Sequence, residues 1–150
     1  MIHIDYRKLL DKILKHFDCQ TGTIHRSTKD GKSLTLVSQI GVPDFLLEKI
    51  SCIPFGKGIA GVAAERKEAV EHCNLQADLG GIAKPDAQKT GVAGSLAVPI
   101  FQKNRMEVIG TLGIGKFVPY QFTDAEKHQL QNFAEELAEH FCSESSASDD

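Results

Sequence analysis

The sequence predicts a single α+β domain built around a mainly antiparallel sheet. Amphipathic helical patterns stand near both ends of the chain, and short strand-like segments separated by glycine and proline turns fill the middle. The regular alternation of strands and helices that is typical of a parallel sheet is missing. The length of 150 residues suits about one domain, and 41 % hydrophobic with 25 % charged residues is an ordinary globular composition.

The chain is expected to begin with a helix followed by a hairpin. Residues 4–18 place apolar side chains at helical spacing with charged ones between them, which predicts an amphipathic helix. The segments Thr21–Ser27 and Ser33–Ile40 have the composition of strands. Asp30 and Gly31 between them predict a tight turn, so the two strands should pair.

A short helix and a short strand should follow the hairpin. Pro43 precedes Asp44–Ile50, which we interpret as a short helix or loop. Residues 52–55 predict an extended piece, and because Pro54 cannot donate a backbone hydrogen bond, this piece suits the edge of the sheet.

A glycine-rich turn at residues 56–61 (GKGIAG) leads into the next predicted helix. It matches the spacing G-x-G-x-x-G, but neither a parallel strand–helix–strand context nor a Walker motif accompanies it, so a dinucleotide site is not supported. The glycines allow a sharp turn and close packing of the helix on the sheet. The free N–H groups at the helix start could also hold an anionic ligand.

The second half of the chain predicts three strands and a long helix. Residues 69–73, 96–101 and 108–117 have strand composition, and the polar stretch 74–91 is irregular. Residues 122–142 predict a helix with Thr123 as its N-cap. The single domain should therefore cover residues 1–142, and we expect 143–150 to be a disordered acidic and serine-rich tail.

Charge and compartment exclude several classes of function. The net charge is −3, and Glu144, Asp149 and Asp150 place an equal charge in the tail, which leaves a nearly neutral body with no basic face for nucleic acid. The start lacks a signal peptide, and no apolar run is long enough to span a membrane, so we expect a cytoplasmic protein. The scattered histidines and cysteines predict free thiols, with no metal and no cofactor.

Five motifs in order resemble those of GAF domains and extend over about residues 4–142. They are residues 53–63 (IPFGKGIAGVA), 74–78 (NLQAD), 95–100 (SLAVPI), 108–113 (VIGTLG) and 122–126 (FTDAE). The resemblance implies a central antiparallel sheet with the terminal helices on one face and a ligand pocket, covered by the irregular loop and helices, on the other. It also adds to the apolar helix faces in favouring a homodimer through the two terminal helices.

The resemblance also implies which residues bind a ligand. It places Ile59 and Ala60 on the pocket floor, and Ile82, Asp86 and Thr90 in the loop above it. Two further ligand-binding candidates are Gln39, in the segment Gln39-Ile40 at the end of the second strand, and Ser95, which lies near the position of a pocket carboxylate in the methionine sulfoxide reductases of the family.

Departures from the family motifs separate this chain from the better defined branches. Gln39-Ile40 replaces the Phe-Asp pair of members that bind cyclic nucleotides, and Gly113 replaces their acidic residue, which would leave donors of the base unpaired. The segment 80–89 lacks the cysteine that attaches a bilin.

The chain also resembles the free methionine-(R)-sulfoxide reductases around residues 53–67, but Ala60 replaces one of their cysteines. A thiol-dependent reductase would have to use Cys52 and Cys73, which lie on adjacent predicted segments.

The sequence thus predicts a small-molecule sensor or regulatory binding domain that acts through dimerisation or a signalling partner. Two alternatives stay open. One is the reductase based on Cys52 and Cys73. The other is an interaction module without a pocket that uses only the helical face.

Overall fold

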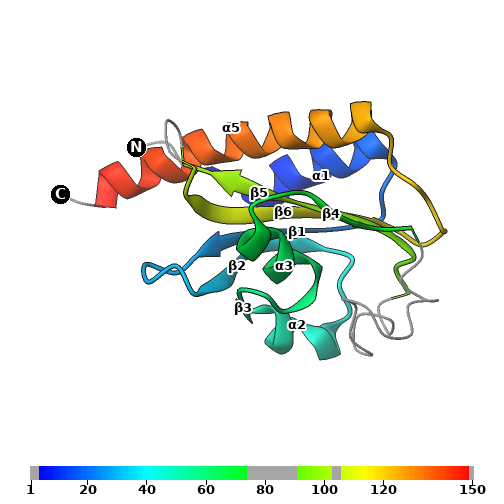
Figure 1. Cartoon of the computed structure of the whole chain (residues 1–150), viewed down its shortest axis with the longest axis horizontal. Coiled ribbons are helices and arrows are strands. Elements are labelled where there is room, and N and C mark those ends of the chain that lie inside the picture. Colours follow the sequence, from blue (N-terminus) through cyan, green and yellow to red (C-terminus); the bar gives the residue numbers. More distant parts are fainter. Residues whose placement is uncertain (1–3, 74–90, 103–105, 149–150) are drawn as a thin grey trace.

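The fold is a six-stranded antiparallel sheet with helices on both faces (Figure 1). The computed structural model describes residues 4–73, 91–102 and 106–148. The strand order is β3-β2-β1-β6-β5-β4. In chain order the elements are α1 (Tyr6–Phe17), β1 (Thr21–Ser27), β2 (Ser33–Ile40), α2 (Asp44–Ile50), β3 (Cys52–Pro54), α3 (Gly58–Arg66), β4 (Val70–His72), β5 (Gly94–Phe101), β6 (Val108–Lys116) and α5 (Asp124–Ser148).

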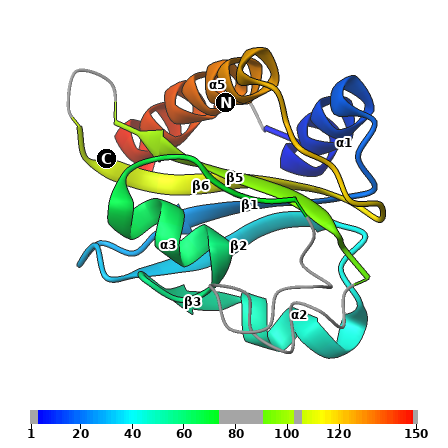
Figure 2. The ribbon, with the colours of Figure 1, turned by 45° about the vertical axis from the view of Figure 1, so that its right-hand side comes forward.

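The two terminal helices lie side by side on one face of the sheet, whereas α2 and α3 lie on the other (Figures 1 and 2). The main core fills the space between the sheet and the terminal helices, and its fully buried members include Leu10, Ile24, Leu112 and Leu137. His16 of α1 joins the helices, because its ring lies 5.5 Å from that of Phe133. The predicted α+β class with an antiparallel sheet is confirmed.

The central hairpin confirms the strand pattern of the sequence. β1 and β2 have the predicted limits and pair antiparallel, and Gly31 adopts the left-handed conformation (φ +70°) that its turn requires. β3 pairs only with β2, so Pro54 lies in an edge strand, where a missing N–H costs least.

Both ends of α1 are capped. Asp5 precedes the helix, and its Oδ1 accepts a hydrogen bond of 3.0 Å from the Lys8 N–H. At the other end the buried Nζ of Lys116 donates to the carbonyl oxygens of Phe17 (2.7 Å) and Asp18 (3.0 Å). A cation at a helix C-terminus compensates the partial negative charge of its free carbonyl groups, so β6 fixes the end of α1.

Replacing Lys116 by methionine is expected to lower the free energy of unfolding by about 2 kcal/mol, because two charge-assisted hydrogen bonds are lost while the stem stays apolar. Urea denaturation measures the effect. Lys15→Met is the matched control: this α1 lysine is exposed and pairs only with Asp11 (2.9 Å), so its loss should cost less than about 0.5 kcal/mol. Equal losses in the two variants would contradict the capping role of Lys116.

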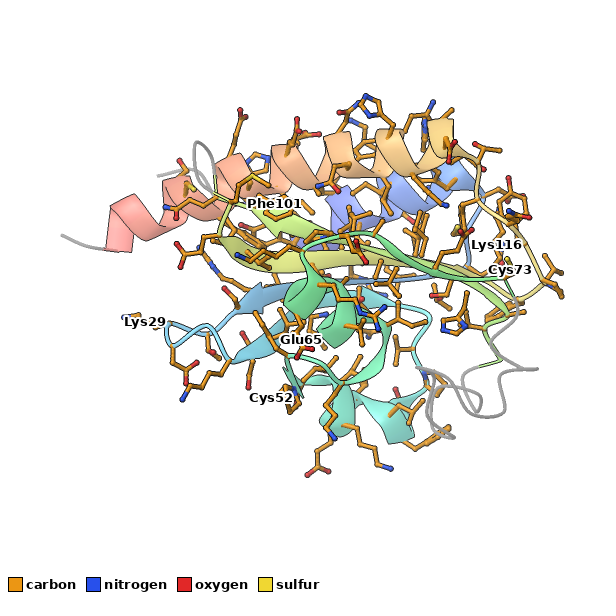
Figure 3. All side chains as sticks on the ribbon, viewed as in Figure 1. Lys29, Cys52, Glu65, Cys73, Phe101 and Lys116 are labelled. Carbon is orange, nitrogen blue, oxygen red and sulfur yellow. The ribbon has the colours of Figure 1, made fainter. Side chains whose placement is uncertain are left out.

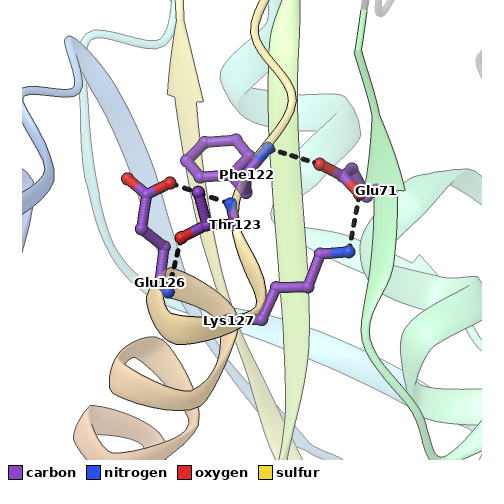
Figure 4. A network of polar contacts seen from close by, with 5 residues as sticks. All are labelled: Glu71, Phe122, Thr123, Glu126 and Lys127. Atoms are coloured by element: carbon purple, nitrogen blue, oxygen red, sulfur yellow. Dashed lines mark hydrogen bonds and ion pairs between the residues drawn. The ribbon is translucent and has the colours of Figure 1, made fainter.

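The start of α5 is held by two sets of polar contacts (Figure 4). Thr123 and Glu126 form a capping box, in which the Thr123 Oγ1 accepts from the Glu126 N–H (3.1 Å) and Glu126 accepts from the Thr123 N–H (2.9 Å). Glu71 of β4 accepts from the Phe122 N–H (2.7 Å) and forms an ion pair with Lys127 (2.9 Å). The predicted N-cap is therefore correct, and the edge strand β4 is tied to α5.

The sequence placed the end of the last helix too early. The helix was expected to stop at Cys142, whereas α5 extends through Ser148. Adding residues to an existing helix costs little compared with starting one, so a weakly patterned serine-rich segment can continue it. The pattern of apolar residues ends before the helix does, and this accounts for the difference.

Candidate functional site

A cavity of about 360 Å³ lies on the face of the sheet opposite α1 and α5. Its size is within the range of small-molecule sites. Residues of β1, β5 and β6 form its floor, and its walls come from α2, β3 and the start of α3. Its described lining consists of Thr21, Gly22, Thr23, Gly41, Val42, Leu46, Lys49, Ile50, Cys52, Ile53, Pro54, Lys57, Gly58, Ile59, Ala60, Val92, Ser95, Ala97, Gly113 and Ile114.

Strand register explains why the floor is hollow. Thr23 of β1 pairs with Gly113 of β6, which pairs with Ala97 of β5. Residues that are directly opposite in a sheet point to the same face, so this row presents only small side chains to the cavity. The next row, in which Thr21, Gly115 and Ser95 are paired, is equally small. Gly113 is the centre of the floor, since a Cβ there would meet only the Thr23 Oγ1 at 3.1 Å and the Leu96 oxygen at 3.9 Å.

The glycine-rich turn forms one wall. Gly56 and Gly58 have positive φ angles (+88° and +65°), which glycine adopts without strain. A Cβ on Gly61 would collide with the Pro54 carbonyl oxygen, so α3 can approach β3 this closely only with glycine at 61. The glycines therefore allow the sharp turn and the close helix packing that the sequence predicted.

The first turn of α3 contributes polar groups to the cavity. Lys57 is the N-cap residue of α3, and among the described residues no side chain caps the first N–H groups of the helix. Lys57, Gly58, Ile59 and Ala60 all line the cavity. Unpaired N–H groups at a helix start carry a partial positive charge, so this wall attracts electron-rich groups.

The charged side chains of the lining have one sign. Lys49 of α2 and Lys57 line the cavity, and none of its described lining residues is Asp or Glu. Together with the start of α3, the Lys57 ammonium group makes this wall of the cavity electropositive.

Only some of the predicted site residues lie at the cavity. Ile59, Ala60 and Ser95 line it, but Gln39 does not. The Gln39 Oε1 instead accepts a hydrogen bond of 3.1 Å from the N–H of Val42, so Gln39 holds the backbone of a residue that lines the cavity. Ile82, Asp86 and Thr90 lie outside the described residues.

The expected neighbourhood of Cys52 and Cys73 is wrong. Cys52 lies in β3 and lines the cavity, whereas Cys73 follows β4 at the opposite edge of the sheet (Figure 3). At about 4.8 Å per strand, roughly 24 Å of sheet separates these edges. The helix α3 carries the chain from one edge to the other, which consecutive position in the sequence does not reveal. The two thiols therefore cannot act as an attacking and resolving pair within one chain.

The remaining thiols do not replace this pair. Burial raises the pKa of the Cys19 thiol to about 11, so it is protonated at neutral pH. Cys142 lies in α5, across the sheet from the cavity. No three His, Cys, Asp or Glu side chains gather as metal ligands within residues 4–73, 91–102 and 106–148.

Sequence reasoning missed several lining residues. Lys57 is part of the glycine motif, and its position at the helix start could have identified it. The small residues Thr21, Thr23 and Ala97 needed the pairing of three strands that are distant in the sequence. Lys49 could not be assigned, because α2 has only one buried residue, Leu46, to orient it.

Comparisons with known proteins agree with this geometry. The sequence model of the GAF domain matches residues 6–141. No curated protein matches the chain by sequence. In the part that the structure describes, no helix has the length and apolar character needed to cross a membrane.

Solved structures share the fold at low sequence identity. The GAF domain of a phosphoenolpyruvate-protein phosphotransferase from Coxiella burnetii has a TM-score of 0.79 at 17 % identity, covering 95 % of this chain and 83 % of that one. A free methionine-R-sulfoxide reductase from Neisseria meningitidis, solved with its substrate, has a TM-score of 0.74 at 20 % identity over 94 % of this chain and 78 % of that one. A Staphylococcus aureus NreA protein mutated in its nitrate binding site has a TM-score of 0.65 at 22 % identity over 83 % and 92 %.

These neighbours include proteins with different activities, so they establish the fold and not a reaction. The fold supports a regulatory or ligand-binding domain. The match over residues 6–141 covers most of the sequence, and the chain therefore belongs to the GAF domain family.

Proposed function

We propose that this GAF domain is a sensor or regulatory module that binds a small anionic ligand in its cavity. The observation that carries the proposal is the wall formed by the start of α3, where Lys57 lines the cavity and no described side chain caps the first N–H groups of the helix. An anion would gain from the Lys57 ammonium group and from the N–H groups at the start of α3, whereas a cation would meet like charge there. The side chains of Leu46, Ile50 and Ile53 form an apolar part of the lining.

A route from the cavity to the terminal helices supports a regulatory role. Thr21 and Thr23 of β1 line the cavity, and Arg26 stands further along the same strand. The Arg26 guanidinium donates to the Phe141 carbonyl oxygen (2.7 Å) and lies 4.6 Å above the centre of the Phe141 ring. A shift of β1 on ligand binding would therefore be transmitted to α5. We further propose that a second copy or a partner protein reads this change at the terminal helices.

Binding of small anions tests the proposal directly. We expect isothermal titration calorimetry with nitrate and with inorganic phosphate to show saturable binding of at least one. Lys57→Gln should weaken that binding about three- to fivefold, since one partly exposed charge contributes about 0.7–1 kcal/mol.

Lys67→Gln is the matched control for Lys57→Gln. Lys67 is the C-cap residue of the same helix, is exposed and does not line the cavity, so its loss should leave the affinity unchanged. Absence of binding by every anion, or equal weakening in both variants, would contradict the proposal.

The two alternatives are less well supported. Cys52 lines the cavity, but Cys73 lies at the other edge of the sheet, so a reductase built on these two thiols lacks its resolving partner within the chain. An interaction module without a pocket does not account for a cavity of about 360 Å³. We therefore expect no turnover of free methionine sulfoxide with thioredoxin and NADPH.

A further inference from the structure

A buried histidine links the centre of the sheet to a wall of the cavity. His25 of β1 is 1 % exposed, and its Nε2 lies 2.9 Å from the carbonyl oxygen of Ile50. Ile50 is the last residue of α2 and lines the cavity. The carbonyl oxygen can only accept, so Nε2 carries the proton and the neutral ring leaves Nδ1 as a bare acceptor.

The other side of this ring is polar but unpartnered. His25 Nδ1 and Thr111 Oγ1 are both buried without a hydrogen-bond partner in the described residues. Thr111 is directly opposite His25 in the β1–β6 pairing, and it is 0 % exposed. Buried polar groups are rarely left without a hydrogen bond, so the unsatisfied His25 Nδ1 and Thr111 Oγ1 lower the stability of the fold at this place.

The wall that His25 supports consists of α2 and of β3, and β3 is paired with β2 along Cys52–Pro54. Leu46 is the only buried residue of α2, and the strand β3 that follows has three residues. Besides the imidazole, the Leu36 N–H donates to the Ser51 carbonyl oxygen (3.0 Å) at the junction of α2 and β3. The end of α2, where it joins β3, is therefore positioned in part by a single buried side chain, His25.

No described charged group near His25 can compensate a positive ring. Leu36 of β2 and Thr111 of β6 are its cross-strand neighbours. Arg26 contacts Phe141 and Lys116 contacts the end of α1, both on the other face of the sheet. The charged residues of α2 and α3 are exposed: Asp44, Glu48, Lys49, Glu65 and Arg66.

We propose that His25 is a positioning residue that holds the α2–β3 wall of the cavity closed while its imidazole is neutral, and that protonation of His25 opens this wall. The inference rests on the proposed function only in that the wall belongs to the ligand cavity. Acid should therefore weaken ligand binding by loosening the wall, without changing any group that contacts the ligand.

The direction of the expected pH effect follows from the difference between the pKa of His25 in the closed state and in the open state. Burial lowers the pKa of His25 from its usual value of 6.5, outweighing the opposite effect of the Ile50 carbonyl. An open state in which the ring is hydrated recovers the ordinary pKa and binds the proton more readily. As the pH falls below about 6.5, opening is favoured by up to tenfold per pH unit, the limit for one proton.

Hydrogen exchange of the wall tests the proposal without any ligand. Mass spectrometry would follow amides of residues 44–56 and of α5 at pH 7.5 and 5.5, corrected for the intrinsic exchange rate. In the unaltered protein we expect the protection of 44–56 to fall by several-fold to about tenfold at pH 5.5 relative to α5. In His25→Gln the protection should not depend on pH, because the amide still donates to Ile50 but does not titrate.

His128→Gln is the matched control, since His128 is an exposed histidine of α5 and its loss should leave the pH response intact. A wall whose protection is independent of pH, or a His25→Gln protein that keeps the response, would overturn the proposal.

Should His25→Gln fail to fold, NMR titration of the His25 ring in the unaltered protein decides instead. A neutral ring protonated at Nε2 down to well below pH 6.5 supports the proposal, and ordinary titration near 6.5 overturns it. Neither readout depends on anion binding, so this inference and the proposed function can fail separately.

Discussion

Replacing Phe141 by alanine is expected to lower the free energy of unfolding by about 3–5 kcal/mol, the usual cost of removing a buried phenylalanine. Phe141 is 2 % exposed, and its ring lies 5.7 Å from that of Tyr6 and below the Arg26 guanidinium. A Cβ on Gly110 would meet the Phe141 Cε2 at 2.9 Å, so the ring packs directly on the backbone of β6. A sheet backbone cannot move in to fill the space left by alanine, and the loss should be near the upper part of that range.

Phe117→Ala is the matched control for this prediction. Phe117 is 51 % exposed just after β6, so its truncation should cost less than about 1 kcal/mol. Urea denaturation followed by circular dichroism measures both variants. A loss below about 1 kcal/mol for Phe141→Ala would show that the last turns of α5 do not pack on the sheet, and would remove the proposed link from β1 to α5.

Filling the floor of the cavity is expected to abolish ligand binding with little loss of stability. In Gly113→Val the new side chain starts at the centre of the floor and points into the cavity, and valine is favourable in a strand. The Cβ would meet the Thr23 Oγ1 at 3.1 Å, a hydroxyl that can rotate away. We expect an affinity at least about tenfold weaker for any anion that binds, with an unfolding free energy within about 1 kcal/mol of the unaltered protein.

A graded series separates filling of the cavity from damage to the sheet. Gly113→Ala adds one carbon and should weaken binding less than Gly113→Val. Gly115 differs from Gly113 in having no room for a side chain. A Cβ there would lie only 2.6 Å from the Thr21 Oγ1 and 2.8 Å from the Val92 Cγ1. Calorimetric titration and thermal unfolding of the two Gly113 variants measure both effects. Unchanged affinity in Gly113→Val would place the ligand elsewhere.

Local patterns in the sequence were sufficient for most of the elements. β1 and β2 are rich in β-favouring residues and are bounded by clear turn signals, so their limits could be predicted. Thr123 marks the start of α5 because its hydroxyl and Glu126 satisfy the free N–H groups there. The end of α5 has no such signal, and residues 143–148 continue the helix despite their serine-rich composition.

Long-range pairing limited what could be predicted of the site. Ile59 and Ala60 were expected at the pocket because the glycine-rich turn resembles a GAF motif, and both line the cavity. Gln39 supports Val42 instead of lining the cavity, a distinction that depends on a loop contact. Cys52 and Cys73 appear adjacent along the chain, yet the order β3-β2-β1-β6-β5-β4 places them at opposite edges. Only the strand order reveals such separations.

Equilibrium dialysis tests the central claim, that the cavity binds a small anion, most directly. The unaltered protein and Gly113→Val would be dialysed in parallel against a cell extract of small molecules, and the compounds enriched on each would be identified by mass spectrometry. We predict at least one anionic compound enriched on the unaltered protein and absent from Gly113→Val. Identical profiles for the two proteins, or enrichment of cationic compounds alone, would contradict the claim.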